Sequence, residues 1–425
     1  MEEIYNPNSE DWKKILKRPT QSIIEIEKIV HSIFKDVQNN GNKSVKKYTK
    51  KYDKIDIDDL LVSKTEIEQA ILQVNDELIE AIQLAKTNIE KFHKNQKIKS
   101  KPIETSKGVI CWQEKRAIQK IGLYIPGGTA PLFSTILMLA IPAQIAGCNE
   151  IILCTPPNEE GKINPVILYT AKLCGLTKIF KVGGIQAISA MTFGTETIPK
   201  VYKIFGPGNQ FVTVAKQIAT KYGIAIDLPA GPSELLVVAD ETSDASFVAS
   251  DLLSQAEHGV DSQVILVSIS KDFIETVKNE ITNQIEILPR KDIAKVSIAN
   301  SKLIYCKNDV IAIDLINEYA PEHLIVHTKN NDFYVKEIQN AGSVFIGAYT
   351  PESAGDYASG TNHTLPTNGY AKAYSGVNLD AFYKLITFQE ISKKGLKNIG
   401  KAIEIMAEAE GLQAHKNAVS LRLNK

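Results

Sequence analysis

The 425-residue sequence has little cysteine, little arginine and no long apolar run, and each shortage excludes a class of protein. The five cysteines are scattered and never spaced C-x-x-C, so we expect neither a disulfide framework nor a cysteine-only zinc site. Lysine plus arginine and aspartate plus glutamate both number 49, so the basic excess of a nucleic-acid-binding protein is absent. Arginine occurs at four positions: Arg18, Arg116, Arg290 and Arg422.

No segment predicts membrane insertion or export. The start, MEEIYNPNSEDWKKILKRP, is polar and is not a signal peptide. The longest apolar run, LFSTILMLAIPAQIAG, is interrupted by Pro142 and Gln144 and is too short to cross a bilayer. We therefore expect a cytoplasmic protein with neither a membrane nor a nucleic acid as its partner.

Residues 21–98 have the apolar spacing of helices, and after Gly108 short apolar runs alternate with amphipathic segments. Strands that alternate with helices are typical of parallel sheets covered by helices, so the sequence predicts an α/β fold with two units. Nine runs predict its buried strands: IGLYIP, EIILCTPP, TKIFKVGG, VYKIFGP, ELLVVAD, SQVILVSIS, SKLIYCK, HLIVHT and GSVFIGA.

Residues 347–380 form a long segment rich in Gly, Ser, Thr, Asn and Pro. A loop of that length in a compact protein is usually functional or disordered, and the presence of Asp356 and His363 favours function. The chain then ends in two helical stretches separated at Gly411. Because this tail is too short to form its own core, we expect it to pack elsewhere, with a second subunit as one candidate.

Two short stretches contain residue types suited to catalysis. In LLSQAEHGVDS, Gln255 and His258 are three apart near a helix end, so they share a face and can reach one point. In EYAPEHLIVHT, Glu322 and His323 place two proton-handling groups at the end of a predicted strand. Taken alone, the first is commonly an ordinary helix end and the second an exposed polar turn.

Signals for a cofactor are weak when taken one at a time. Neither G-x-G-x-x-G nor G-x-x-x-x-G-K-[ST] occurs, but LYIPGGTAP, VGGIQAISA and FGPGNQFV are glycine-containing turns between a strand and a helix, where backbone N–H groups can bind phosphate. Three such turns in one unit favour a nucleotide pocket. The residues alone indicate an α/β enzyme with such a pocket. They leave open whether candidate zinc ligands converge: Gln255, His258, Asp356 and His415.

Seven motifs in order along the chain resemble the histidinol dehydrogenase family, whose members depend on zinc and NAD. The motifs are GLYIPGGTAPLFSTILMLAIPAQIAGC, GPGN, DLPAGPSE, LLSQAEHG, APEHL, GDYASGTNHTLPT and EAEGLQAHKNAVSLR. The resemblance implies two incomplete Rossmann-like units with parallel sheets, plus helical N-terminal and C-terminal pieces. It also implies oxidation of L-histidinol to L-histidine through L-histidinaldehyde, with two NAD reduced.

The resemblance implies a role for each matching residue. The ligands of one Zn²⁺ per subunit would be Gln255, His258, Asp356 and His415. The acid/base pair would be Glu322 and His323. Positions around NAD would be Tyr124, Gln186 and Asn209. The substrate would meet the zinc ligands and His323 together with Ser233, His363 and Glu410. In a homodimer, Glu410 and His415 would complete the other subunit's site.

The resemblance also implies a domain division. Residues 20–123 and 233–377 would form an α/β domain with the zinc and acid/base residues, and 124–232 a second α/β domain with the NAD-site residues. Residues 1–19 and 378–397 would form a small helical domain, and 398–425 a helical tail that reaches the partner subunit.

Three other functions remain as alternatives. A relative on the same scaffold would oxidise a different amino alcohol or a diol. A cysteine-dependent aldehyde dehydrogenase would need a thiolate beside the nicotinamide, but no cysteine lies in a candidate loop. A non-catalytic NAD- or metal-binding protein would not need Glu322 and His323, and both are present.

Overall fold

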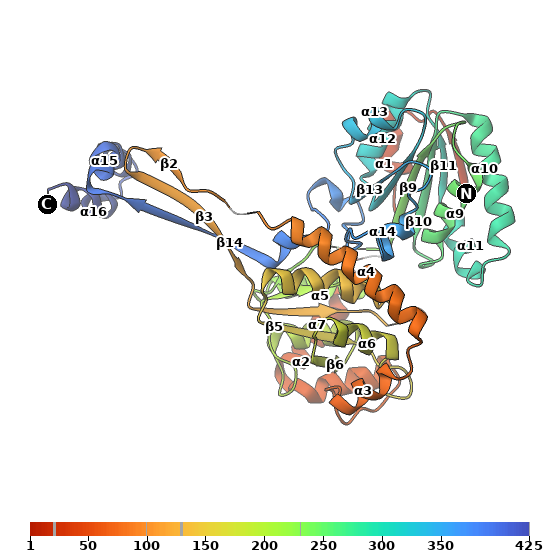
Figure 1. The fold of residues 1–425 in the computed structure, drawn as a ribbon, viewed down its shortest axis with the longest axis horizontal. Helices are drawn as coiled ribbons and strands as arrows, with labels where there is room; N and C mark the ends of the chain where they lie inside the picture. The colour runs from red at the N-terminus through yellow and green to blue at the C-terminus, as the bar shows by residue number, and fades with distance from the viewer. Residues whose placement is uncertain (20–22, 99, 128–130, 230, 425) are drawn as a thin grey trace.

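The computed structural model describes residues 1–19, 23–98, 100–127, 131–229 and 231–424. Two lobes of sheet and helix carry a long projecting arm (Figure 1). The α/β class with two parallel-sheet units is confirmed, and strands β4–β7 and β9–β13 correspond to the nine predicted strands. Among the described residues, no helix combines the length and the apolar character needed to span a bilayer.

Lobe 1 is built on a six-stranded parallel sheet in the order β1-β11-β10-β9-β12-β13. Its helices pack on both faces, so the central strands are buried along their whole length and are apolar without alternation. The strands are β1 (Glu2–Tyr5), β9 (Glu234–Ala239), β10 (Gln263–Ser268), β11 (Lys302–Tyr305), β12 (His323–His327) and β13 (Ser343–Ile346). Helices α9 (Ala245–Ala256), α10 (Lys271–Ile285) and α11 (Lys291–Ala299) cover one face, and α1 (Trp12–Ile15), α12 (Asp309–Tyr319) and α13 (Asn331–Glu337) lie on the other.

Lobe 2 is built on a five-stranded parallel sheet in the order β6-β5-β4-β7-β8. The strands are β4 (Lys120–Tyr124), β5 (Glu150–Thr155), β6 (Lys178–Lys181), β7 (Lys203–Phe205) and β8 (Ala225–Ile226). One face packs against α3 (Lys64–Ile71), α4 (Asp76–Asn95), α5 (Ser134–Ala146) and α6 (Pro165–Leu173). The other packs against α2 (Ile23–Tyr52), α7 (Gly184–Phe193) and α8 (Gln210–Thr220).

Side-chain caps define the starts of the helices that matter for function. The Asp244 carboxylate accepts hydrogen bonds from the backbone N–H groups of Ser246 and Phe247, which fixes the start of α9. Asn209 caps α8 in the same way by accepting from the N–H of Val212. These caps replace hydrogen bonds that the first turn of a helix cannot make internally.

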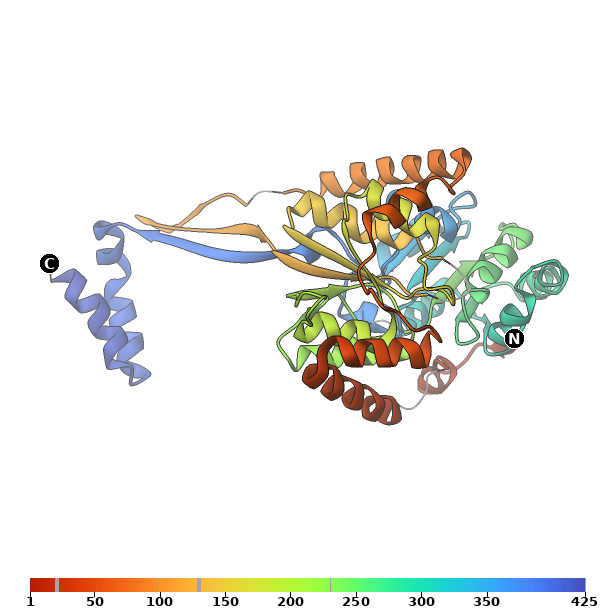
Figure 2. The same cartoon turned by 90° about the horizontal axis from the view of Figure 1, so that it is seen from below.

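The arm is an antiparallel sheet in the order β14-β3-β2 that ends in a helical hairpin. Its elements are β2 (Ile103–Ser106), β3 (Val109–Ala117), β14 (Tyr383–Ile391), α15 (Lys393–Ala409) and α16 (Gln413–Leu423). Both views place α15 and α16 at the far end of the arm, away from the lobes (Figures 1 and 2). The arm exposes large apolar side chains: Ile103, Leu385, Ile386, Ile391, Ile405, Met406 and Leu421.

The observed packing corrects the domain division. Helices α2, α3 and α4 pack on lobe 2, because their apolar residues are buried in its two cores rather than against lobe 1. Residues 1–19 supply β1, which pairs with β11, and α1 instead of joining a small helical domain. Residues 383–391 form strand β14, which pairs with β3. The predicted boundary at residue 20 lies outside the described residues.

Candidate active site

Five of the candidate residues belong to segments that meet at the amino edge of the lobe 1 sheet. Ser233 precedes β9, and Glu322 and His323 lie at the start of β12. Gln255 and His258 lie at the end of α9, whose chain then leads into β10. This edge is opposite to the carboxyl edge at which α/β sheets ordinarily bind ligands.

The acid/base candidates are buried and held by backbone groups. Glu322 Oε2 accepts a hydrogen bond from the backbone N–H of Glu234 at 2.8 Å. His323 Nδ1 lies 3.2 Å from the backbone oxygen of Glu234. Because that oxygen only accepts, Nδ1 must carry the proton, and Nε2 of the neutral ring keeps its lone pair. His323 Nε2 is buried and has no hydrogen-bond partner among the described residues. The Asp356 oxygen Oδ1 lies 3.6 Å from Nε2, so a cation bound to Asp356 would leave the lone pair of Nε2 free to accept a proton.

A group of metal-ligand side chains lies beside His323. Single ligand atoms of His258, Glu352 and Asp356 lie within 4.8 Å of one another, and α14 (Glu352–Tyr357) supplies both carboxylates. When Glu352 is ionised, as it would be beside a bound cation, its carboxylate can only accept, so the Gln255 amide turns its nitrogen toward Glu352 and donates to it. The amide oxygen of Gln255 then remains available as a ligand.

The negative charge of this cluster is of the kind that a bound cation would balance. Burial and the neighbouring carboxylates raise the pKa of Glu352 well above its ordinary value, against the opposing effect of His323. Burial alone would raise the pKa of Asp356, but the nearby histidines bring it below its ordinary value. Burial alone would lower the pKa of His323, but Glu322, Glu352 and Asp356 raise it. A bound cation would balance the negative charge of these carboxylates and would lower the pKa of His323 again.

These donors fit a zinc ion. One imidazole nitrogen with carboxylate and amide oxygens matches the nitrogen and oxygen ligands that zinc accepts. Gln255, His258 and Asp356 are the residues of one chain that could hold it, with Glu352 either behind Gln255 or as a further ligand.

His363 connects this cluster to lobe 2. Its Nδ1 donates to the backbone oxygen of Asp356 at 2.8 Å, and its Nε2 accepts from the Thr135 hydroxyl at 3.0 Å. Burial lowers the pKa of His363, which keeps the ring neutral for this pair of bonds. Thr135 lies in the first turn of α5, so the amino edge of lobe 1 meets the carboxyl edge of lobe 2 here.

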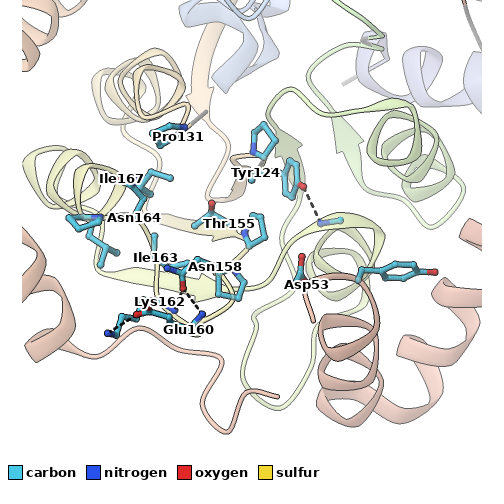
Figure 3. Close-up of a pocket in the computed structure, with 18 of the residues that line it drawn as sticks. Asp53, Tyr124, Pro131, Thr155, Asn158, Glu160, Lys162, Ile163, Asn164 and Ile167 are labelled. Carbon is cyan, nitrogen blue, oxygen red and sulfur yellow. Dashed lines mark hydrogen bonds and ion pairs between the residues drawn. The ribbon is translucent and has the colours of Figure 1, made fainter. Parts of the chain in front are cut away.

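The carboxyl edge of the lobe 2 sheet holds a pocket of about 980 Å³ (Figure 3). Tyr124, Gln186 and Asn209 all line it, so the structure brings together the three residues predicted around NAD. The Tyr124 hydroxyl accepts from the backbone N–H of Gly184 at 3.0 Å, and the Gln186 amide lies 3.5 Å from Asp53. The pocket also reaches Pro131, in the segment that leads to Thr135. Residues 128–130 of this segment, in the middle of a predicted phosphate-binding turn, lie outside the described residues.

Two predicted site residues lie elsewhere. Glu410 and His415 are exposed at the helical end of the arm, away from the lobes of their own chain (Figure 1). Within one chain, the metal cluster therefore lacks the predicted fourth ligand.

The sequence interpretation missed two residues of the site. Glu352 is four residues before Asp356 on one helical turn, and this spacing is the signal that could have found it. Thr135 sits in an apolar run and gave no signal, because only the fold brings it to His363.

The cysteines do not offer a thiol nucleophile. Burial raises the pKa of Cys174 and of Cys306 to about 12, and also raises the pKa of Cys148 to about 12 and that of Cys154 further. Cys111 lies on β3 in the arm. A thiolate beside the pocket at neutral pH therefore has no candidate.

The fold and the site define an α/β enzyme with a buried Glu322–His323 pair, a group of side chains that could hold a metal ion, and a separate pocket of about 980 Å³. The family model described as histidinol dehydrogenase matches residues 16–423. The chain belongs to the histidinol dehydrogenase family, and it is thus an oxidoreductase.

Relatives match along the whole chain. It is 57% identical over 425 residues to a histidinol dehydrogenase of Bacteroides fragilis, covering 100% of this chain and 99% of that one. It is 52% identical over 421 residues to one of Campylobacter jejuni, covering 98% and 97%. The crystal structure of histidinol dehydrogenase from Elizabethkingia anophelis superposes with a TM-score of 0.97 at 57% identity, covering 100% of this chain and 98% of that one.

Proposed function

We propose that this protein oxidises L-histidinol to L-histidine through L-histidinaldehyde, the end of histidine biosynthesis, with two NAD reduced and one Zn²⁺ per subunit. The observation that carries the proposal is the buried Nε2 of His323, which has no hydrogen-bond partner in the described part of the chain and lies 3.6 Å from Asp356 of the metal cluster. The names of the relatives supply the substrate, and we place the coenzyme in the pocket of lobe 2, which the three residues predicted around NAD line.

Each chain residue has a defined task in the first oxidation. His323 Nε2 accepts the hydroxyl proton of the alcohol while the carbinol carbon gives its hydride to NAD, which leaves the aldehyde, NADH and one proton. The hydrogen bond from Nδ1 to the Glu234 carbonyl keeps the ring in the tautomer that this requires. The Zn²⁺ held by Gln255, His258 and Asp356 would bind the imidazole and amino nitrogens of the substrate and so orient it.

The second oxidation needs water and a base. Glu322 would take a proton from water while the water oxygen attacks the aldehyde carbon. The resulting hydrate would give a second hydride to NAD. The products are the carboxylic acid, NADH and a proton, so the whole reaction removes four electrons. Tyr124, Gln186 and Asn209 would line the coenzyme site. Ser233, His363 and the partner subunit's Glu410 would contact the substrate.

A homodimer completes this proposal. The arm carries His415 and Glu410 away from their own lobes and exposes apolar side chains that a partner would cover. We therefore place His415 of the partner subunit as the fourth zinc ligand, with Glu410 of the partner subunit at the substrate.

The decisive test is the amount of NADH formed per L-histidinol consumed, with and without a zinc chelator. Two NADH per substrate, abolished by chelation and restored by zinc, would support the reaction and the metal together. One NADH would mean that the reaction stops at a carbonyl compound. No NADH from L-histidinol would overturn the proposal and favour another amino alcohol or a diol.

A further inference from the structure

Both members of the acid/base pair are held by the backbone of one residue. Glu234 is the first residue of β9, and its N–H donates to Glu322 Oε2 at 2.8 Å. Its carbonyl oxygen accepts from His323 Nδ1 at 3.2 Å. Any movement of the Glu234 backbone would therefore displace the base and its neighbouring carboxylate together.

The side chain of Glu234 is fixed by a buried ion pair. Arg18 Nε lies 2.6 Å from Glu234 Oε1, and Arg18 Nη2 lies 2.9 Å from Oε2, so the guanidinium grips both carboxylate oxygens. The backbone N–H of Asn368 adds a third hydrogen bond to Oε1 at 2.6 Å. Glu234 is almost fully buried, so its carboxylate depends on these donors.

Arg18 itself is held in place from two directions. Its Nη2 also donates to the backbone oxygen of Tyr319 at 2.7 Å, and its guanidinium carbon lies 4.0 Å above the ring of Tyr319. Nothing in this arrangement touches the metal cluster or the coenzyme pocket. The N-terminal segment, through Arg18, thus holds Glu234, whose backbone binds Glu322 and His323.

We propose that Arg18 and Glu234 are positioning residues, which hold the peptide that orients Glu322 and His323 for the oxidation. This inference rests on the proposed function. Arg18 acts through Glu234 and contacts neither substrate nor coenzyme.

The surface around Arg18 permits an unusually direct test. Arg18 lines an open groove of about 400 Å³ together with Lys13, Leu16, Glu318 and Lys372. If Arg18 is shortened to alanine, a small planar cation can enter from this groove and occupy the place of the guanidinium. Guanidinium has the fork that Glu234 accepts, whereas urea has the same shape without the charge.

The experiment compares wild type, Arg18→Ala and Arg18→Lys with Lys13→Ala, which removes a positive charge from the same groove without touching Glu234. We expect Arg18→Ala to lower kcat about 10- to 100-fold in both half-reactions with KM within about twofold, because a displacement of about 1 Å can cost about 10²-fold. Millimolar guanidinium should restore kcat and urea should not. Arg18→Lys should keep part of the wild-type kcat, and Lys13→Ala should have the same kcat as wild type.

A second readout does not depend on turnover. Nitrogen-15 NMR of labelled histidine should show the Nδ1–H tautomer of His323 in wild type, and a mixture of tautomers in Arg18→Ala. If Arg18→Ala does not fold, Arg18→Lys and Glu234→Gln carry the same comparison. An unchanged kcat in Arg18→Ala would overturn the positioning role. A lower kcat that guanidinium does not restore, together with an unchanged His323 tautomer, would also overturn it. Failure of the proposed function is distinct, because wild type itself would then not reduce NAD with L-histidinol.

Discussion

Replacing Glu352 by glutamine tests how a glutamine comes to act as a metal ligand. Glu352 is buried, and its carboxylate receives the amide nitrogen of Gln255, which leaves the amide oxygen for the metal. A glutamine at position 352 can offer its own NH₂ to Gln255 and so favour the opposite orientation of that amide. Removing a partner that orients a ligand typically costs about 10- to 100-fold in metal affinity, or about 1.4–2.7 kcal/mol.

The assay is competition for zinc between the metal-free protein and a chromophoric chelator, with the gain in Tm on adding zinc as a second measure. Glu241→Gln is the matched control, because it makes the same substitution at an exposed position of lobe 1. A Glu352→Gln affinity within about twofold of wild type would refute the reasoning. If Gln255→Ala keeps wild-type affinity while Glu352→Gln loses it, Glu352 is the ligand in place of Gln255.

Three further predictions concern Glu322, the arm and the pocket of lobe 2. Glu322→Gln should impair oxidation of the aldehyde more than oxidation of the alcohol, and equal aldehyde rates in variant and parent would contradict its role. His258→Asn and His415→Asn, each inactive alone, should regain activity when their subunits are mixed, because one site of the mixed dimer keeps all its ligands; no recovery after proven subunit exchange would exclude shared sites. Burial raises the pKa of Asp53 to about 6, above its unfolded value near 3.8, so its contribution to stability is complete below about pH 4 and is lost as the pH rises to about 6. In Asp53→Asn, the free energy of unfolding measured with urea should fall less steeply between about pH 4 and pH 6. The same pH dependence in the variant and the parent would exclude this role of Asp53.

The nine strands were predictable because both lobes cover their sheets on both faces. A strand such as β10, QVILVS, is buried along its whole length and therefore stands out as an apolar run. The arm strands have no such cover within one chain. In β14, only Tyr383 and Phe388 reach even intermediate burial, so its sequence carries no pattern of a core strand. The tail helices were predictable from their spacing and from Gly411, whose φ of 73° suits a glycine between helices.

The domain division failed for a different reason. Apolar spacing shows that α2 and α4 each bury one face, but not which sheet receives it. Ile33 and Phe34 of α2 meet the core of lobe 2, and Ile89 of α4 is buried on the other face of the same sheet. That choice depends on shape and connection lengths, which local pattern does not record.

The site shows the same limit at the level of single atoms. The spacing of Gln255 and His258 predicts a shared face, but a glutamine is a metal ligand only if another group occupies its nitrogen, and Glu352 lies almost a hundred residues further along the chain. The base depends in the same way on a distant residue. His323 can act through Nε2 because Glu234 fixes Nδ1, and Glu234 stays in place because Arg18 grips it from the N-terminal segment. The motif APEHL predicts Glu322 and His323 as an acid/base pair. The orientation of their side chains, however, depends on contacts that only the folded chain creates. For this reason a change at Arg18 should affect catalysis although it replaces none of the predicted site residues.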